Sequence, residues 1–288
     1  MDFPYYQLVP KDFGANLKFR HSILEEAKID PKAQQEFYDM CSRDVLFYVN
    51  TFLYTIDPRN ADQPIVPFLT YEYQDEAMSD IMEIFGKDDI LFEKSRDMGA
   101  TWINLIPIEW HWHFSPSRLT FLLVSRKSEY VYMKGDEKAL FSKIDMMHEY
   151  LPSWLQPQAD RKEMHYRNSL TGSTIDGEAT TGDVGRGDRR TVIFMDEFAA
   201  VEVKDGHRAN KSTRATTACR IFNSTYQGTN NAFYELATET DIKKILLDIA
   251  KEEKTHVGEF QTLLLERDKQ QVRELEEGRK EVEEELAE

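Results

Sequence analysis

The segment Ile90-Leu91-Phe92-Glu93-Lys94-Ser95-Arg96-Asp97-Met98-Gly99-Ala100-Thr101-Trp102 decides the fold of this 288-residue chain. Its apolar start predicts a buried strand over residues 88–93, and the residues after it predict a helix over residues 101–114. A helix that begins directly after a tight turn offers unpaired backbone N–H groups and a partial positive charge to an anion. The order strand, turn, helix therefore predicts a phosphate-binding loop over residues 94–101.

This loop keeps only part of the usual phosphate-loop pattern, G-x-x-x-x-G-K-[ST]. Gly99 and Thr101 are in place, but Ala100 stands at the lysine position and Lys94 stands at the first glycine. We expect Lys94 to replace the missing lysine at the β- and γ-phosphates, and the Thr101 hydroxyl to bind Mg²⁺. The alternative for Lys94 is a surface lysine next to Glu93. The residues expected to contact the nucleotide here are Lys94, Ser95, Arg96, Asp97, Met98, Gly99, Ala100 and Thr101.

A second segment, Thr191-Val192-Ile193-Phe194-Met195-Asp196-Glu197, ends an apolar run with two acids. A continuous apolar run is typical of a buried parallel strand, and open α/β sheets bind ligands beyond the carboxyl ends of their strands. We expect Asp196 to hold Mg²⁺, directly or through water, and Glu197 to polarise an attacking water. The alternative is a strand end with solvated acids. The phosphate loop earlier in the chain favours a nucleotide hydrolase.

The remaining pattern predicts an α/β protein. Helical spacing covers residues 32–54, 71–85 and 128–150, whereas residues 1–30 read as irregular and 175–187 as a hairpin and loop. Alternating strands and helices imply a parallel central sheet flanked by helices with right-handed crossovers. The predicted strands after the first are 119–124, 191–195 and 220–224. The domains expected are an N-terminal helical lid region (1–59), a nucleotide-binding core (60–240) and a charged helical tail (241–288).

Composition narrows the classes of function. Lys and Arg total 36 and Asp and Glu total 52, a net charge of −16, which argues against broad coating of nucleic acid. The two cysteines, Cys41 and Cys219, form no C-x-x-C pair, so neither zinc nor a disulfide framework is indicated and a reducing compartment is expected. The N-terminus lacks the pattern of a signal peptide, and no apolar run is long enough for a bilayer. We expect no membrane association.

Five features in order resemble the ATPase domain of the large terminase subunit, the motor that packs DNA into the capsids of tailed phages. The resemblance covers roughly residues 60–235, and its more specific parts are the segments 194–199 and 222–225. It implies a P-loop NTPase fold of the RecA/ASCE-like type, with ATP and Mg²⁺ bound. The five features are Tyr73-Gln74, the loop 94–101, Val124-Ser125-Arg126-Lys127, Gly185-Arg186-Gly187-Asp188-Arg189 and Ser224-Thr225.

The resemblance also implies roles for polar residues outside the loop pattern. Gln74 would contact adenine, with a solvated helix position as the alternative. Arg96 would lie near the γ-phosphate, or form a salt bridge to Asp97. Arg186 or Arg189 would reach a neighbouring subunit as an arginine finger, which contributes about 10³-fold or more in rate. The alternative for each is a loop arginine in solvent. The residues expected to couple hydrolysis to movement are Ser224 and Thr225, for which turn or capping chemistry is the alternative.

The tail differs from the rest of the chain. It contains Glu253 and His256, the Glu-x-x-His spacing of di-iron helix bundles, and the segment to Leu265 resembles a ferritin-like helix. One such helix supplies only half of a di-metal site, so a second copy would be required. The alternative is a solvated amphipathic helix that mediates association.

The sequence thus predicts an ATP hydrolase that translocates double-stranded DNA into a procapsid. The partners implied by the resemblance are DNA, a portal protein, a small terminase subunit and copies of this chain in a ring, in the host cytoplasm and transiently on the procapsid portal. No second set of strand-borne carboxylates follows Thr225, so the nuclease domain of a full terminase is expected to be absent. The alternatives are a non-catalytic nucleotide-binding module that docks on the portal or small subunit, and a helicase-like P-loop ATPase.

Overall fold

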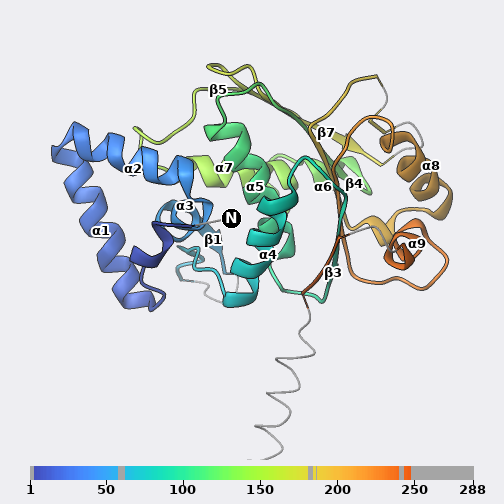
Figure 1. Cartoon of the computed structure of the whole chain (residues 1–288), viewed down its shortest axis with the longest axis horizontal. Coiled ribbons are helices and arrows are strands. Elements are labelled where there is room, and N and C mark those ends of the chain that lie inside the picture. Colours follow the sequence, from blue (N-terminus) through green and yellow to red (C-terminus); the bar gives the residue numbers. More distant parts are fainter. Residues whose placement is uncertain (1–2, 58–61, 181–183, 186, 240–242, 248–288) are drawn as a thin grey trace, which may run out of the picture. The chain divides into compact units, whose positions relative to one another are not determined.

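The computed structural model describes residues 3–57, 62–180, 184–185, 187–239 and 243–247 (Figure 1). Contacts divide the chain into two compact units, Met1–Leu247 and Asp248–Glu288, and the described residues all belong to the first. Among these residues we find no helix with the length and hydropathy of a membrane span.

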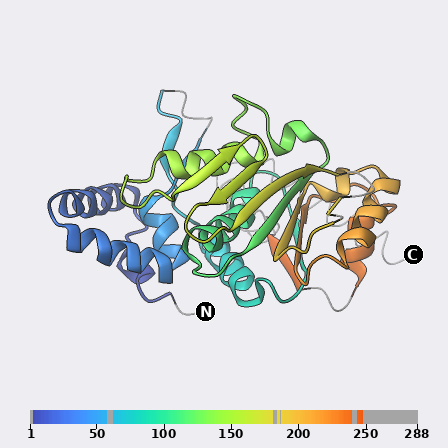
Figure 2. The same cartoon turned by 90° about the horizontal axis from the view of Figure 1, so that it is seen from above.

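One twisted sheet organises the described residues (Figure 2). Its strand order is β10-β3-β9-β8-β4-β7-β6-β5; the pairs from β10 to β7 are parallel, and β6 and β5 extend the sheet in antiparallel pairs. The predicted fold class, a parallel central sheet flanked by helices, is therefore confirmed. The strand bounds are β3 (Ile90–Lys94), β4 (Thr120–Ser125), β5 (Ala159–Lys162), β6 (His165–Asn168), β7 (Thr174–Ala179), β8 (Val192–Asp196), β9 (Arg220–Ser224) and β10 (Lys243–Leu247).

The central strands are apolar on both faces because helices cover both. Successive side chains in a strand point to opposite faces. One set packs against η2 (Phe198–Ala200), α8 (Val203–Thr213) and α9 (Ala232–Thr238). Figure 1 shows α8 and α9 on this side of the sheet. The opposite face is covered by α4 (Glu72–Ile84), α5 (Ala100–Phe114) and α7 (Leu140–Glu149). The strand residues in the core beneath α8 and α9 are Leu91, Leu122, Val124, Ile193, Met195 and Phe222.

The N-terminal residues form helices rather than the irregular segment expected over 1–30. The prediction was wrong because the inward face of α1 carries Asn16 and Arg20, which are buried and polar and so hide the helical pattern. The Arg20 guanidinium donates to backbone oxygens of Leu53, Asn50 and Phe68. The elements of this region are η1 (Tyr6–Leu8), α1 (Phe13–Ile29), α2 (Pro31–Arg43), the fully buried α3 (Val45–Phe52) and a small sheet of β1 (Tyr54–Ile56) and β2 (Ile65–Pro67).

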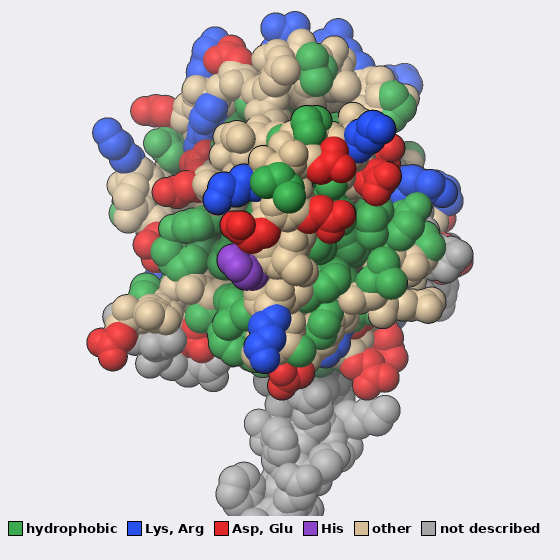
Figure 3. Space-filling view, turned by 90° about the vertical axis from the view of Figure 1, so that its left-hand side faces the viewer, with side chains coloured by type: hydrophobic (Ala, Val, Ile, Leu, Met, Phe, Trp, Pro, Cys, Tyr) green, Lys and Arg blue, Asp and Glu red, His purple; other side chains and the backbone are tan. Residues whose placement is uncertain are grey.

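The outward side of these helices is mixed in character. Figure 3 shows this side, where Lys and Arg lie interspersed with Asp and Glu, among exposed apolar side chains. Phe13, Leu17 and Leu24 of α1 contribute to the exposed apolar surface. This side of the protein is therefore not the continuous basic surface that binding to a nucleic-acid phosphate backbone requires.

Three other boundaries differ from the predictions. The helix expected over 128–150 is interrupted between α6 (Ser128–Val131) and α7, where Gly135 has φ 82°. The hairpin expected over 175–187 is wrong, because β7 pairs with the preceding strand β6. The strands β5 and β6 were not predicted, because they are short and largely polar. A helix was expected from residue 241, but residues 243–247 form the strand β10. This short apolar run gains its backbone hydrogen bonds by pairing with β3.

Candidate nucleotide site at the carboxyl edge of the sheet

The loop between β3 and α5 has the strand–turn–helix geometry expected for a phosphate site. β3 ends at Lys94, and α5 begins at Ala100 with Gly99 as its N-cap in the left-handed region, at φ 67°. Asp97 also has a positive φ, 64°, which is strained for a residue with a side chain. The N-terminus of a 15-residue helix thus faces the turn, and its free N–H groups suit an anion.

Gln74 fixes this turn from α4. Its Nε2 donates to the Met98 carbonyl oxygen at 3.1 Å, and its Oε1 accepts from the Tyr71 backbone N–H at 3.1 Å. A Cβ added to Gly99 would lie 2.9 Å from Gln74 Nε2. Gln74 is buried, with both ends of its amide engaged in backbone contacts. The structure thus gives it a role in supporting the loop, and the predicted contact with adenine stays a prediction.

Lys94 and Glu197 meet across the site. Lys94 Nζ lies 2.7 Å from Glu197 Oε1, and their side chains are 11% and 36% exposed. Glu197 follows the last residue of β8 and has φ 52°, the second non-glycine residue in the left-handed region among those described. Strained backbone of this kind costs about 1–3 kcal/mol and persists where surrounding structure enforces it. Glu197 combines this backbone conformation with a carboxylate that lies against Lys94 of the loop.

Asp196 lies beside Thr101 and Asn223. Its carboxylate oxygens are both 3.4 Å from Thr101 Oγ1, and its Oδ1 accepts a hydrogen bond of 2.6 Å from Asn223 Nδ2. Burial raises the pKa of Asp196 to about 6; the Asn223 hydrogen bond opposes this rise, and the charge of Glu197 adds to it.

Sequence reasoning assigned Asn223 no role. It lies in β9 one residue before Ser224, and β9 pairs directly with β8, so a polar side chain at this point of the neighbouring strand reaches Asp196. The available signal was the polar break after the apolar run Ile221-Phe222.

The donors present fit a magnesium ion. Mg²⁺ is a hard cation that binds one or two protein oxygens and completes its shell with water and nucleotide phosphates. A carboxylate and a hydroxyl converge here at Asp196 and Thr101. Within the described ranges, no group of three or more His, Cys, Asp or Glu residues could hold a metal by itself.

The other predicted residues lie in the loop and at the end of β9. Arg96 is exposed within the loop. Ser224 is buried, and its Oγ accepts from the Ala199 N–H at 3.1 Å, which ties the end of β9 to the segment after Glu197. Ser95 and Thr225 are half-buried.

Of the two candidate finger arginines, the structure describes only Arg189, and Arg189 is not part of this arrangement. Arg189 is exposed, and its carbonyl oxygen accepts from Thr120 Oγ1 at 3.1 Å, at the amino end of β4. That edge of the sheet is opposite to the loop, so Arg189 does not reach the site of its own chain. Arg186, Glu253 and His256 lie outside the described residues.

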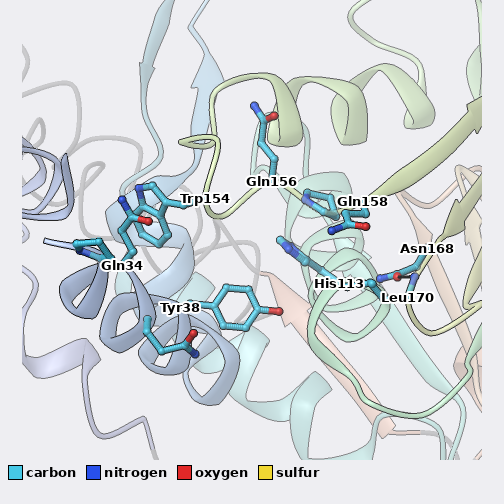
Figure 4. Close-up of a pocket in the computed structure, with 11 residues that line it drawn as sticks. Gln34, Tyr38, His113, Trp154, Gln156, Gln158, Asn168 and Leu170 are labelled. Atoms are coloured by element: carbon cyan, nitrogen blue, oxygen red, sulfur yellow. Dashed lines mark hydrogen bonds between the residues drawn. The ribbon is translucent and has the colours of Figure 1, made fainter. Parts of the chain in front are cut away.

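A separate cavity of about 340 Å³ lies between α2, the end of α5 and the loop before β5 (Figure 4). Its wall includes Tyr38, His113, Trp154 and Asn168, with glutamine side chains from α2 and from the loop before β5. None of the predicted site residues lines it.

A parallel sheet in which an inner strand leads into a helix N-terminus, with an acidic strand end two strands away at the same carboxyl edge, is the arrangement of the P-loop NTPase-like class of α/β folds. Solved structures of large terminases share this fold. The chain is similar to the HK97 bacteriophage large terminase, with 12% identity, 74% of this chain and 46% of that chain covered, and a TM-score of 0.53. The predicted resemblance to large terminase subunits is confirmed at the level of the fold.

Two further structures are similar. One is an ATPase-domain mutant of the Thermus phage P74-26 large terminase, with 13% identity, 64% of this chain and 86% of that chain covered, and a TM-score of 0.45. The other is the large terminase of a thermophilic bacteriophage in complex with ADP, with 11% identity, 62% of this chain and 45% of that chain covered, and a TM-score of 0.47.

The sequence comparisons are limited in extent. No family model matches the chain. A stretch of 46 residues is 56% identical to the ferritin-like–encapsulin shell fusion protein of Pyrococcus furiosus, which is 16% of this chain and 13% of that protein. The chain therefore spans less than half of the HK97 terminase and a small part of the archaeal protein.

Proposed function

We propose that this chain is the ATPase motor of a DNA-packaging terminase, which hydrolyses ATP with Mg²⁺ and moves double-stranded DNA into a procapsid. The observation that supports this most is the convergence of Lys94, Glu197, Thr101 and Asp196 on one loop. Phosphoryl transfer in such sites depends on positioning and on charges that oppose those of the transition state. The four side chains supply a cation, a carboxylate that orients water, and two oxygen ligands.

Each residue has a distinct task in this proposal. Lys94 leaves Glu197 and binds the β- and γ-phosphate oxygens, while the N–H groups at the start of α5 hold the phosphate backbone. Glu197, released from its ion pair, accepts a proton from the water that attacks in line. Thr101 and Asp196 would hold Mg²⁺, which would neutralise negative charge on the phosphates. Asn223 orients Asp196, and Ser224 transmits the movement of the Glu197 segment to β9.

The partners follow from the same proposal. DNA contacts would go to the phosphate backbone and carry no sequence information. Copies of the chain would form a ring, so that an arginine of one subunit reaches the site of the next. The ring would dock on a portal protein with a small terminase subunit, in the host cytoplasm and transiently at the procapsid.

The test is ATP hydrolysis with and without Mg²⁺ over a series of protein concentrations, with wild type beside Lys94→Ala. We expect Mg²⁺-dependent turnover that rises with protein concentration and is lost in the variant. If the Lys94→Ala variant hydrolyses ATP at the wild-type rate, the assignment of Lys94 to the phosphate site is wrong.

A second candidate is a docking module that does not hydrolyse ATP. It is favoured by Ala100, a buried residue at the position where the loop usually has its lysine. Wild-type protein that neither binds nor hydrolyses ATP at any concentration would support this candidate over the motor.

A further inference from the structure

Lys143 of α7 lies near the loop although no sequence motif contains it. Its Nζ is 5.8 Å from the centre of the Trp102 ring, and Trp102 directly follows Thr101 in the first turn of α5. The same ammonium donates to the backbone oxygens of Lys138 at 2.6 Å and Glu137 at 3.3 Å. These contacts hold its charge beside the start of α5, where the phosphate is expected.

The electrostatics of Lys143 point to the same place. It belongs to the first turns of α7, which begins at Leu140, where the helix dipole disfavours a cation. Burial lowers the pKa of Lys143, and the charge that most opposes this shift is that of Asp196, followed by Asp136. Glu137 raises the pKa of Lys143 as well, whereas Lys138 lowers it. Lys143 is thus a partly desolvated ammonium near a helix N-terminus, a position in which a cation gains from a negatively charged ligand.

Lys94 and Lys143 act on the same carboxylate. Both charges lower the pKa of Asp196, that of Lys94 more than that of Lys143. Ala100, at the position where the loop pattern usually has its lysine, is 3% exposed and carries no charge. Lys94 is in addition neutralised by Glu197 at 2.7 Å. The site therefore contains two cations. Lys94 is paired with the Glu197 carboxylate, and Lys143 of α7 donates to two backbone carbonyl oxygens.

We propose that Lys143 is a second phosphate-binding cation, which together with Lys94 supplies the charge that position 100 lacks. This inference rests on the proposed function, since it concerns the same nucleotide site. An ammonium has three N–H donors, and the two carbonyl bonds of Lys143 leave one for a phosphate oxygen. This proposal places the third donor at the γ-phosphate, which ADP lacks, so Lys143 should favour ATP over ADP.

The experiment measures the affinities of the full chain for ATP and ADP with Mg²⁺, by calorimetry, together with thermal unfolding. Lys143→Gln removes the charge but keeps an amide that can still donate to the carbonyls of Glu137 and Lys138. Lys143→Arg keeps the charge. Lys138→Gln is the matched control, because Lys138 is an exposed lysine of the same turn. We expect Lys143→Gln to weaken ATP binding about tenfold, the size of one lost charged hydrogen bond, with a smaller effect on ADP.

The outcomes separate the two proposals. Lys143→Arg and Lys138→Gln should keep the wild-type preference for ATP. If Lys143→Gln binds ATP as wild type does, or loses ATP and ADP equally together with its thermal stability, Lys143 is only an anchor for the turn and the inference is wrong, while the motor proposal stands. If wild-type protein binds no nucleotide, both proposals are overturned.

Discussion

Lys94 Nζ and Glu197 Oε1 are 2.7 Å apart, so the expected phosphate cation and the expected water-orienting carboxylate pair with each other. In the proposed mechanism the two groups act separately, Lys94 at a phosphate and Glu197 at a water. Nucleotide binding in that mechanism breaks the pair. The proposal thus makes release of the Glu197 carboxylate a consequence of phosphate binding, and Glu197 keeps its left-handed backbone, φ 52°, at the end of β8.

Replacement of Glu197 by Gln should separate hydrolysis from binding. The amide cannot accept a proton from water, and loss of a general base lowers the rate by about 10²–10⁴-fold. ATP binding should be equal to or tighter than in wild type, because Lys94 no longer has a charged competitor. Steady-state hydrolysis and calorimetric binding would be measured side by side. Hydrolysis at the wild-type rate would show that Glu197 is not the base.

The pKa of Asp196 predicts a pH dependence for Mg²⁺-dependent nucleotide binding. The ion requires the ionised carboxylate, and burial raises the pKa to about 6. Affinity should therefore be constant above about pH 7 and fall as the pH drops through 6. Asn223→Ala removes a hydrogen bond that favours the ionised form, so its midpoint should move to higher pH. A midpoint that is the same in both proteins would show that Asp196 does not control binding.

The same shift predicts an effect of Asp196 on stability. Because its pKa is higher in the folded than in the unfolded chain, the folded state binds the additional proton between about pH 4 and 6, and stability falls as the pH rises through that range. At pH 7.5 the ionised, buried Asp196 is destabilising. Asp196→Asn should thus increase the free energy of unfolding by about 2–3 kcal/mol, the size of the shift, while hydrolysis is lost. Thermal unfolding at pH 7.5 and pH 4 checks this, since the gain should shrink at the lower pH.

Gln74 and Gly99 form a pair whose energetic coupling can be measured. Gly99→Ala places a Cβ 2.9 Å from Gln74 Nε2 and also demands a positive φ from alanine. We expect it to cost about 1–2 kcal/mol. Gln74→Ala removes the steric part but not the backbone part, so the two substitutions together should cost less than the sum of the single ones. Additive costs in chemical denaturation would mean that the two side chains do not meet.

Much of this site followed from local pattern. The apolar runs before Lys94 and Asp196 predicted core strands, and the turn at Gly99 predicted the helix after it, because these signals depend on neighbouring residues alone. The partners of Asn223 and Lys143 could not be predicted in that way, although a polar break after Ile221-Phe222 marks the first of them. Each of these polar side chains has its partner in another part of the fold. Asn223 donates to Asp196 at the end of β8, and Lys143 donates to the Lys138 carbonyl oxygen in the turn before α7. Only the arrangement of the strands and helices brings them together.

The N-terminal and C-terminal parts were harder for a related reason. The buried side of α1 includes Asn16 and Arg20 beside Ile23 and Ala27. The two polar side chains donate to backbone oxygens of Asn50 and Leu53, and they weaken the apolar pattern of the helix. The strand over 243–247 exists because the edge of β3 provides hydrogen-bond partners, which no local propensity encodes.

The position of Arg189 predicts how a finger arginine would have to act. Its backbone lies at the amino end of β4, at the edge of the sheet away from Lys94, so any contact with phosphate must be made to a neighbouring subunit. Arg189→Ala should bind ATP normally and lose only the part of the activity that rises with protein concentration, by about 10³-fold for a true finger. Arg96→Ala, a substitution within the loop itself, serves as the comparison and should lower activity at every concentration. Mixing Arg189→Ala with Glu197→Gln should restore turnover, because an intact base in one subunit then meets an intact arginine from the next. A mixture that stays inactive, or an Arg189→Ala protein with full cooperative activity, would exclude Arg189 as the finger.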